Sequence, residues 1–410
     1  MTLDFKNQRR WAVGLSLGMT AYIIVVDTLM RPLHALGVGQ RVLGFVNGLS
    51  AMLQFPGFLV AINLGLRDGH HTHPAVWGLI VAVNFLMWAV GLRFVLRVLF
   101  PPIAAARVDG PPESNETDAT PPARPSRRRF LTYGARLTAG GAGAVGAYSF
   151  LVETRWFEVT RRTFPLAGLP PALDGLRIVQ LTDIHHGPNL SLDYVVRVVN
   201  ATNALTPDLV LLTGDYVYRS PVYIEPVVQA LGRLRARIAV LGVLGNHDWW
   251  EDPARTRDAF NRVEIPLIDN DRRFISPDRA LTRGLPGEGV CIAGVGDYWE
   301  DETLFDDALD GVPRDMPRLL LSHNPDVAED TRLLRHRVDL QLSGHTHGGQ
   351  VRLPFLGTPL TSSRFGSKYA SGLVQGPVGP VYTSCGIGST ILPLRFRVKP
   401  EITLIELRAV

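Results

Sequence analysis

The sequence predicts an α/β domain in its C-terminal part, preceded by a helical part that enters a membrane. Two observations predict this division. Residues 11–100 are strongly apolar, whereas residues 155–410 have a mixed composition and alternate short apolar strands with helical stretches. In addition, several strands end directly before a polar cluster, as in α/β proteins that assemble sites at the carboxyl ends of strands. A chain of 410 residues has room for one large domain and an extra module.

The first hundred residues are predicted to form three transmembrane helices. The stretches 11–30, 42–66 and 75–100 are long and apolar enough to cross a bilayer, which takes about 20 residues. Buried helices of a soluble domain are the alternative, but three such stretches in succession favour a membrane. Asp27 is the one carboxylate inside these stretches. Transport pathways usually contain charged residues inside the membrane, and a single carboxylate is only weak evidence for such a pathway. Anchoring is therefore a better interpretation than a transporter or channel.

Residues 101–129 are rich in Pro and Arg and lack apolar periodicity, so we expect a disordered linker. The run Ser-Arg-Arg-Arg-Phe-Leu at 126–131 resembles a twin-arginine export signal, and we expect residues 130–153 to form a fourth membrane segment. Seven arginines between Arg93 and Arg129 predict a cytoplasmic flank. Four crossings would then place the C-terminal domain on the extracytoplasmic face of the cytoplasmic membrane, although the basic residues at positions 6, 9 and 10 argue the other way.

Charge and cysteine content exclude two classes of function. The formal net charge is +4, but the arginines form no stripe interleaved with aromatic residues, so no nucleic-acid partner is predicted. Cys291 and Cys385 are the only cysteines, and each lies in or beside an apolar run. We therefore expect two core thiols rather than a disulfide framework or a thiolate metal site.

The domain at 155–410 contains five polar clusters, and each of them follows the end of a predicted strand. Strands are predicted at 176–181, 209–212, 238–244, 290–295, 318–322 and 338–342, and helices at 191–205 and 223–235. The clusters, in chain order, are Asp183-Ile184-His185, Gly214-Asp215, Gly245-Asn246-His247-Asp248, Ser322-His323-Asn324 and Gly344-His345-Thr346-His347. Any one of them alone would be an ordinary turn, but five in one domain indicate a single site.

These clusters offer the donors that bind divalent metals. Two carboxylates, four imidazoles and one amide oxygen are available, and no cysteine takes part, which suits Mn, Fe or Zn rather than a thiolate zinc site. The pairs Asp183/His185 and His345/His347 have i, i+2 spacing. In extended backbone such side chains point the same way, so we expect each pair to face one pocket.

The five clusters resemble the signature of calcineurin-like metallophosphoesterases, which reads Asp-x-His, Gly-Asp, Gly-Asn-His-Asp, a lone His, and Gly-His-x-His. The match runs from about residue 178 to 347. Gly348-Gly349-Gln350, the stretch 365–369 and the ending CGIGSTILPLRFRVKPEITLIEL at 385–407 further resemble the membrane-linked branch of YkuE-type and YaeI-type phosphodiesterases. The resemblance covers residues 155–408. It implies a four-layer α/β sandwich, in which two mixed sheets lie face to face between helices.

The resemblance also implies a role for each residue of the clusters. The implied ligands of a first divalent metal are Asp183, His185 and His347, those of a second are Asn246, His323 and His345, and Asp215 would bridge the two. His247 would protonate the leaving oxygen or stabilise phosphoryl charge, and Asp248 would orient His247. Two cations in such a site can clamp phosphoryl oxygens and activate water.

The implied activity is hydrolysis of a phosphodiester or pyrophosphate. Membrane tethering favours a lipid or glycolipid substrate, such as a UDP-diacylglucosamine-like pyrophosphate. The alternatives are a phosphomonoesterase acting on nucleotides or phosphoproteins, and a metal-binding scaffold without activity. An apolar rim beside the metals is a further expectation, with ordinary packing as its alternative; it would be formed by residues 354–359, Tyr298, Trp299, Trp249 and Trp250.

Overall fold

The computed structural model describes residues 127–391 and 393–410. The three predicted membrane spans, and all but the last three residues of the predicted linker, lie outside this range. Residues 149–410 belong to one compact unit, which is called here the C-terminal domain.

Helix α4 (Arg127–Leu151) covers most of the predicted fourth membrane segment. Within the described part of the chain, however, no helix, α4 included, combines the length and the apolar character that a membrane crossing requires. Glycine and alanine are the most frequent residues of α4, and their small side chains contribute little hydrophobicity. The segment predicted at 130–153 is therefore helical as far as Leu151. The fourth crossing and the extracytoplasmic face that depends on it stay predictions.

The first sheet of the C-terminal domain has five strands. Their order across the sheet is β1 (Glu158–Leu166), β12 (Glu401–Ala409), β2 (Leu176–Leu181), β3 (Leu209–Thr213) and β4 (Ala239–Val243). Strand β12 pairs in parallel with β1 and antiparallel with β2, so the last strand of the chain is inserted beside the first two. The sheet is therefore mixed, and β2, β3 and β4 run parallel within it.

The second sheet has seven strands. Their order is β10 (Gly372–Gln375), β11 (Pro380–Thr383), β9 (Leu340–Ser343), β8 (Arg318–Leu321), β7 (Val290–Gly294), β5 (Asp271–Ile275) and β6 (Leu281–Thr282). The central strands β11, β9, β8 and β7 are parallel, and β10, β5 and β6 add antiparallel edges.

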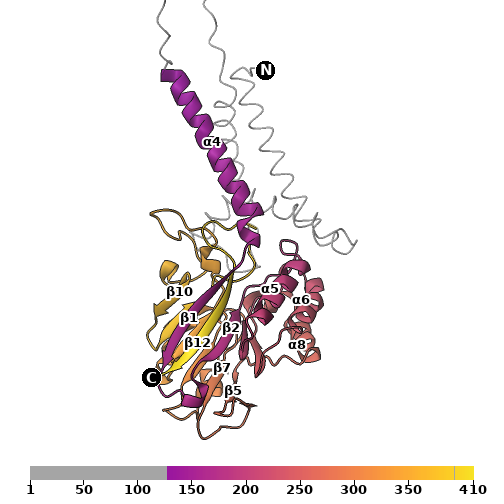
Figure 1. The fold of residues 1–410 in the computed structure, drawn as a ribbon, viewed down its shortest axis with the longest axis vertical. Helices are drawn as coiled ribbons and strands as arrows, with labels where there is room; N and C mark the ends of the chain where they lie inside the picture. The colour runs from indigo at the N-terminus through magenta and orange to yellow at the C-terminus, as the bar shows by residue number, and fades with distance from the viewer. Residues whose placement is uncertain (1–126, 392) are drawn as a thin grey trace, which may run out of the picture. The chain divides into compact units, whose positions relative to one another are not determined.

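The two sheets pack face to face, and helices cover their outer faces (Figure 1). Between the sheets, Leu211 and Leu241 share a buried cluster with Ile292 and Leu321. Helices α5 (Leu192–Ala204), α6 (Ile224–Leu231) and α8 (Pro253–Arg262) cover the first sheet. Helix α9 (Phe305–Leu309) and the 3₁₀ segments Pro325–Glu329 and Thr331–Arg335 cover the second. The predicted four-layer sandwich of two mixed sheets is confirmed.

The predicted elements agree closely with the observed ones, except at the end of one helix. The helix expected at 223–235 ends at Leu231, and residues 232–233 form a turn. The elements that were not predicted are helices α7 (Asn246–Glu251), α8 and α9 and strands β1, β5, β6, β10, β11 and β12. Both cysteines are free thiols, as expected.

Candidate metal centre

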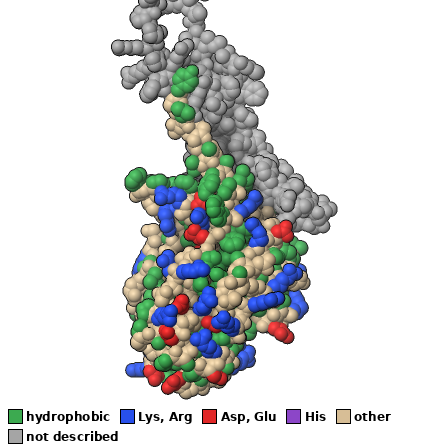
Figure 2. All heavy atoms as spheres, viewed as in Figure 1, with side chains coloured by type: hydrophobic (Ala, Val, Ile, Leu, Met, Phe, Trp, Pro, Cys, Tyr) green, Lys and Arg blue, Asp and Glu red, His purple; other side chains and the backbone are tan. Residues whose placement is uncertain are grey.

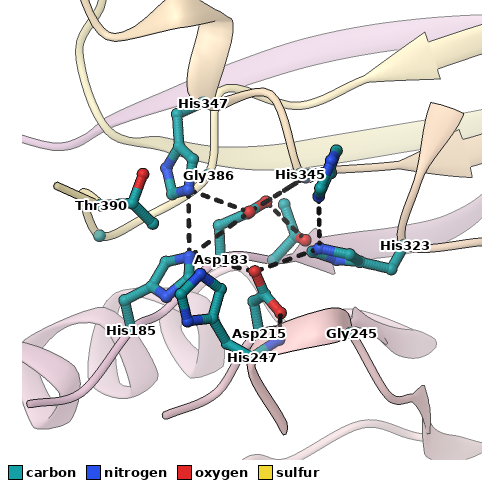
Figure 3. Close-up of polar contacts among 12 residues, drawn as sticks. Asp183, His185, Asp215, Gly245, His247, His323, His345, His347, Gly386 and Thr390 are labelled. Carbon is teal, nitrogen blue, oxygen red and sulfur yellow. Dashed lines mark hydrogen bonds and ion pairs between the residues drawn. The ribbon is translucent and has the colours of Figure 1, made fainter. Parts of the chain in front are cut away.

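The five polar clusters converge at one edge of the sandwich, although they come from both sheets. Three follow β2, β3 and β4 of the first sheet, and two follow β8 and β9 of the second. Main-chain bonds continue the parallel pairing beyond the strands, from Asp183 N to Gly214 O (2.9 Å) and from His185 N to Asp215 O (3.0 Å). All five clusters therefore contribute to a single buried site (Figure 3).

The first group of potential metal ligands is Asp183, His185 and His347. The two imidazoles meet through their Nε2 atoms at 3.0 Å. Asp183 Oδ1 lies 3.3 Å from His347 Nε2 and 3.7 Å from His185 Nε2. The carboxylate is held by the main-chain N–H of His345, which lies 3.0 and 2.9 Å from its two oxygens, and by the Thr182 hydroxyl.

The second group is Asp215, His323 and His345, with Asn246 beside them. Asn246 Oδ1 lies 3.1 Å from His323 Nε2 and 2.9 Å from His345 Nδ1, and these two nitrogens are 3.2 Å apart. His323 Nδ1 lies 2.8 Å from the carbonyl of Thr213. Because a carbonyl only accepts, Nδ1 of His323 carries a proton, and Nε2 is the nitrogen that faces the site.

Asp215 lies between the two groups. Its Oδ2 is 3.3 Å from His185 Nε2 of the first group and 3.1 Å from His323 Nε2 of the second. Its Oδ1 accepts the main-chain N–H of His247 at 2.8 Å. One carboxylate oxygen thus faces both groups, while the other fixes the loop that carries His247.

The ligand-bearing backbone is strained rather than extended. The φ angles are 51° at Asp183, 49° at His185, 59° at Asp215, 68° at His345 and 53° at His347. The expectation that the i, i+2 pairs lie in extended backbone is therefore wrong: tight left-handed turns bring each pair together. Such a conformation costs a non-glycine residue about 1–3 kcal/mol and persists where the surroundings enforce it, typically at functional sites.

His247 and Asp248 lie beside Asp215. The His247 ring makes an edge contact with His185, with ring centroids 4.7 Å apart. The Asp248 carboxylate accepts main-chain N–H bonds, each 2.9 Å long, from Asp215, Tyr216 and Gly245. Asp248 therefore clamps the loop after β3 to the loop after β4, and it acts on the position of His247 through the backbone.

The electrostatics of the site favour lone pairs on His345 and His347 and negative charge on two carboxylates. Burial lowers the pKa of His323, but the charge of Asp215 outweighs burial and raises it to about 10. Burial, reinforced by neighbouring histidines, lowers the pKa of His345 and of His347 to about 3. Burial alone would raise the pKa of Asp183 and Asp215, but the surrounding histidines lower both below the usual range. Burial and the charge of Asp215 raise the pKa of Asp248, and its N–H donors counteract this.

This donor set fits divalent cations. Nitrogen atoms face one another at 3.0 and 3.2 Å with carboxylate or amide oxygens beside them, a crowding of electron-rich atoms that a cation would relieve. Mixed imidazole and carboxylate donors without a thiolate suit Mn, Fe or Zn. All seven predicted ligands are brought together here.

Comparison with known proteins agrees with this geometry. A family model described as calcineurin-like phosphoesterase matches residues 176–349. The uncharacterized metallophosphoesterase YkuE of Bacillus subtilis (strain 168) is 33% identical over 291 residues, which are 69% of this chain and 98% of that protein. The chain belongs to the calcineurin-like phosphoesterase family. It is accordingly a metal-dependent phosphoester hydrolase.

Further relatives of this metallophosphoesterase carry more specific names. Phosphodiesterase YaeI of Escherichia coli (strain K12) is 30% identical, with 69% of this chain and 99% of that protein covered. A transmembrane protein with metallophosphoesterase domain from Bos taurus is 30% identical over 61% of this chain and 57% of that protein. UDP-2,3-diacylglucosamine pyrophosphatase LpxG of Chlamydia trachomatis is 26% identical, with 62% of this chain and 90% of that protein covered.

The aromatic residues expected to line the metallophosphoesterase site divide into two groups. Trp299 packs edge-on against His345 at 4.3 Å between ring centroids, and Trp250 against His247 at 4.4 Å. These two form walls beside the site, and the indole N–H of Trp250 donates to Glu300 at 2.7 Å. Trp249 and Tyr298 instead pack against the hydrophobic cores, so ordinary packing explains them.

Arg395 is a site residue that sequence reasoning missed. Its side chain is fully buried, and its guanidinium donates to the carbonyls of Cys385, Gly386 and Gly388. One of its nitrogens lies 3.5 Å from His347 Nδ1. The loop it holds supports the site, because Gly388 N donates to Asp183 O at 2.6 Å. An arginine within the apolar run LPLRF is the only signal that the sequence offers.

Proposed function

We propose that this metallophosphoesterase is attached to a membrane and uses two divalent cations to hydrolyse a phosphodiester or pyrophosphate bond of a lipid or glycolipid substrate. The observation that carries the binuclear part is the position of Asp215. Its single oxygen faces His185 at 3.3 Å and His323 at 3.1 Å, which is where a carboxylate shared by two cations belongs.

The residues of the site would divide the work as follows. Asp183, His185 and His347 would hold one cation, Asn246, His323 and His345 the other, and Asp215 both. Bound cations would supply positive charge for the phosphoryl oxygens and activate a water for attack on phosphorus.

His247 is proposed as the proton donor to the leaving oxygen. It stands at the edge of the ligand cluster against His185, and its main-chain N–H is fixed on Asp215. Asp248 would be a positioning residue, because its three main-chain bonds set the geometry of the two loops that carry Asp215 and His247. The walls of Trp250 and Trp299 would limit access of bulk water and strengthen electrostatic contacts with the substrate.

The substrate class rests on the relatives and on the N-terminal sequence. One relative is named a phosphodiesterase and another a pyrophosphatase of a diacylated nucleotide sugar. The apolar stretches at 11–30, 42–66 and 75–100 would keep the enzyme beside such substrates, and another relative is named a transmembrane protein.

The test is turnover by the purified full-length chain in detergent. Hydrolysis of bis(p-nitrophenyl) phosphate with added Mn should be lost in Asp215→Asn and His247→Ala, while only Asp215→Asn should also lower the bound metal. Gly287→Ala is the matched control, because a Cβ there meets nothing within 4 Å. A metal-loaded protein that is inert toward diester, monoester and pyrophosphate probes would favour the scaffold alternative. Turnover of the monoester alone would favour a phosphomonoesterase.

A further inference from the structure

A short hairpin beyond the metal ligands presents an apolar tip to solvent. Leu353 and Gly357 exchange both main-chain hydrogen bonds, at 2.7 and 3.0 Å, and close the hairpin 351–357. At its tip Phe355 is fully exposed and Leu356 is 75% exposed. Phe355 has a φ of 66°, so the turn holds a bulky side chain outward in a conformation that such residues rarely adopt. Two adjacent large apolar side chains displayed in this way indicate a binding surface.

The hairpin is tied to the place where the chain enters the C-terminal domain. Val351 pairs with Phe396, and Arg352 N donates to Phe396 O at 2.9 Å. The neighbouring Arg395 N donates to Ser149 O at 3.2 Å. Exposed apolar side chains also follow Ser149, at Leu151, Val152 and Trp156. The hairpin and the first residues of the domain are thus joined through the segment 395–398.

The sequence segment that contains the hairpin carries charge of one sign. Residues 340–400 contain six basic residues and no acidic residue. Arg352, Arg364 and Arg397 are exposed. Lys399 lies over the exposed ring of Trp156 at 5.3 Å and pairs with Glu158 at 3.2 Å. Figure 2 shows hydrophobic and basic side chains adjoining one another on the upper part of the domain. Apolar residues, a tryptophan and basic side chains together are the composition of surfaces that lie in a membrane interface.

We propose that the hairpin 351–357 inserts Phe355 and Leu356 into the surface of an anionic bilayer, with the surrounding basic side chains on the lipid headgroups. The segment 340–400 has basic but no acidic residues, so the negative surface potential of anionic lipids would attract it. The apolar tip would be accommodated at the boundary between headgroups and acyl chains. The apolar stretches upstream of the domain would keep such a bilayer within reach. Binding to a soluble protein partner would not by itself require that acidic residues be absent from 61 consecutive positions.

The hairpin also connects the bilayer to the metal centre, an extension that rests on the proposed function. The segment that follows the hairpin forms hydrogen bonds with the ligand-bearing turn: Thr358 Oγ1 donates to Gly348 O at 3.5 Å, and Ser362 Oγ donates to His345 O at 2.9 Å. Docking at the tip would therefore bring the site close to phosphate groups carried by lipids.

The experiment measures insertion and needs no turnover. The full-length chain carrying Phe355→Cys is labelled with an environment-sensitive fluorophore and reconstituted in nanodiscs of phosphatidylcholine with or without phosphatidylglycerol. Leu285→Cys is the matched control, because Leu285 is 52% exposed and lies in the loop between β6 and β7. The unsubstituted chain treated with the dye gives the background from Cys291 and Cys385.

With phosphatidylglycerol present, the label at 355 should emit at shorter wavelength and be quenched by brominated lipid. Aqueous iodide should quench the fluorescence of the label at 355 several-fold less than that of the label at 285. Arg352→Gln combined with Arg397→Gln should weaken this protection, whereas Arg283→Gln should not. The proposal is overturned if the two labels are equally open to iodide, if protection is the same in neutral lipid, or if it arises only when a soluble protein fraction is added.

Discussion

Replacing Gly344 by alanine should disable the metal centre through steric crowding alone. Gly344 precedes His345, and its φ lies outside the left-handed region, so an alanine there suffers no backbone strain. A Cβ at this position would lie 2.1 Å from Asp183 Oδ2 and 2.1 Å from Thr182 Oγ1. Carbon and oxygen atoms approach to about 3.3 Å at closest. The Asp183 carboxylate or the His345 turn must therefore move by roughly 1 Å, the difference between these two distances.

A displacement of this size at a reacting centre costs on the order of 100-fold in rate. We expect Gly344→Ala to lose about that factor in kcat/KM on a soluble diester and to bind less metal, as measured by mass spectrometry of the desalted protein. Gly287→Ala, with open space around its Cβ, should match the wild type. A Gly344→Ala enzyme with full metal content and activity near wild type would show that Asp183 does not need its observed position.

Three further predictions concern Arg395, the cations and the hairpin. Arg395→Leu should lower the free energy of unfolding in urea by several kcal/mol, because buried carbonyls left without a donor cost about 1–3 kcal/mol each; Arg395→Lys should recover only part of this loss. Chelation of divalent metal should lower the melting temperature, and added Mn should restore it, since ligands bound only by the native state stabilise it. Phe355→Ser with Leu356→Ser should reduce turnover of a lipid-borne phosphodiester in vesicles while leaving that of bis(p-nitrophenyl) phosphate unchanged; equal loss on both substrates would contradict a membrane-docking role.

The sequence predicted which residues meet in the site because the signal is local. Asp183, Asp215 and His323 each follow a short, mostly apolar run, and in parallel sheets the ends of such runs lie at one edge. The way in which the residues meet was not predictable. Left-handed φ values are more frequent at Asp and His than at most other non-glycine residues, but residue type alone does not show which of them adopt these values. The main-chain bonds of Asp248 depend on how two loops pack.

The limits of prediction for the fold have the same origin. Strand β2 was predicted to the residue, since its six largely buried positions have a mostly apolar sequence. The position of β12 between β1 and β2 could not be inferred, because pairing over more than 200 residues leaves no periodic trace. Arg395 was missed for a related reason. Its partners are main-chain carbonyls of a loop, and because every residue has such a carbonyl, these partners cannot be recognised in the sequence.

The two sheets meet chemically at the metal centre as well as in the hydrophobic core. Asp183 and His185 follow a strand of the first sheet, whereas His347 follows a strand of the second; Asp215 and His323 face each other across the same boundary. Each proposed cation would therefore bind ligands from both sheets. Because metal bound in this way resists separation of the sheets, its free energy of binding adds to that of folding. The strained turns around the ligands would then be stabilised both by the packing of the sandwich and by the proposed cations.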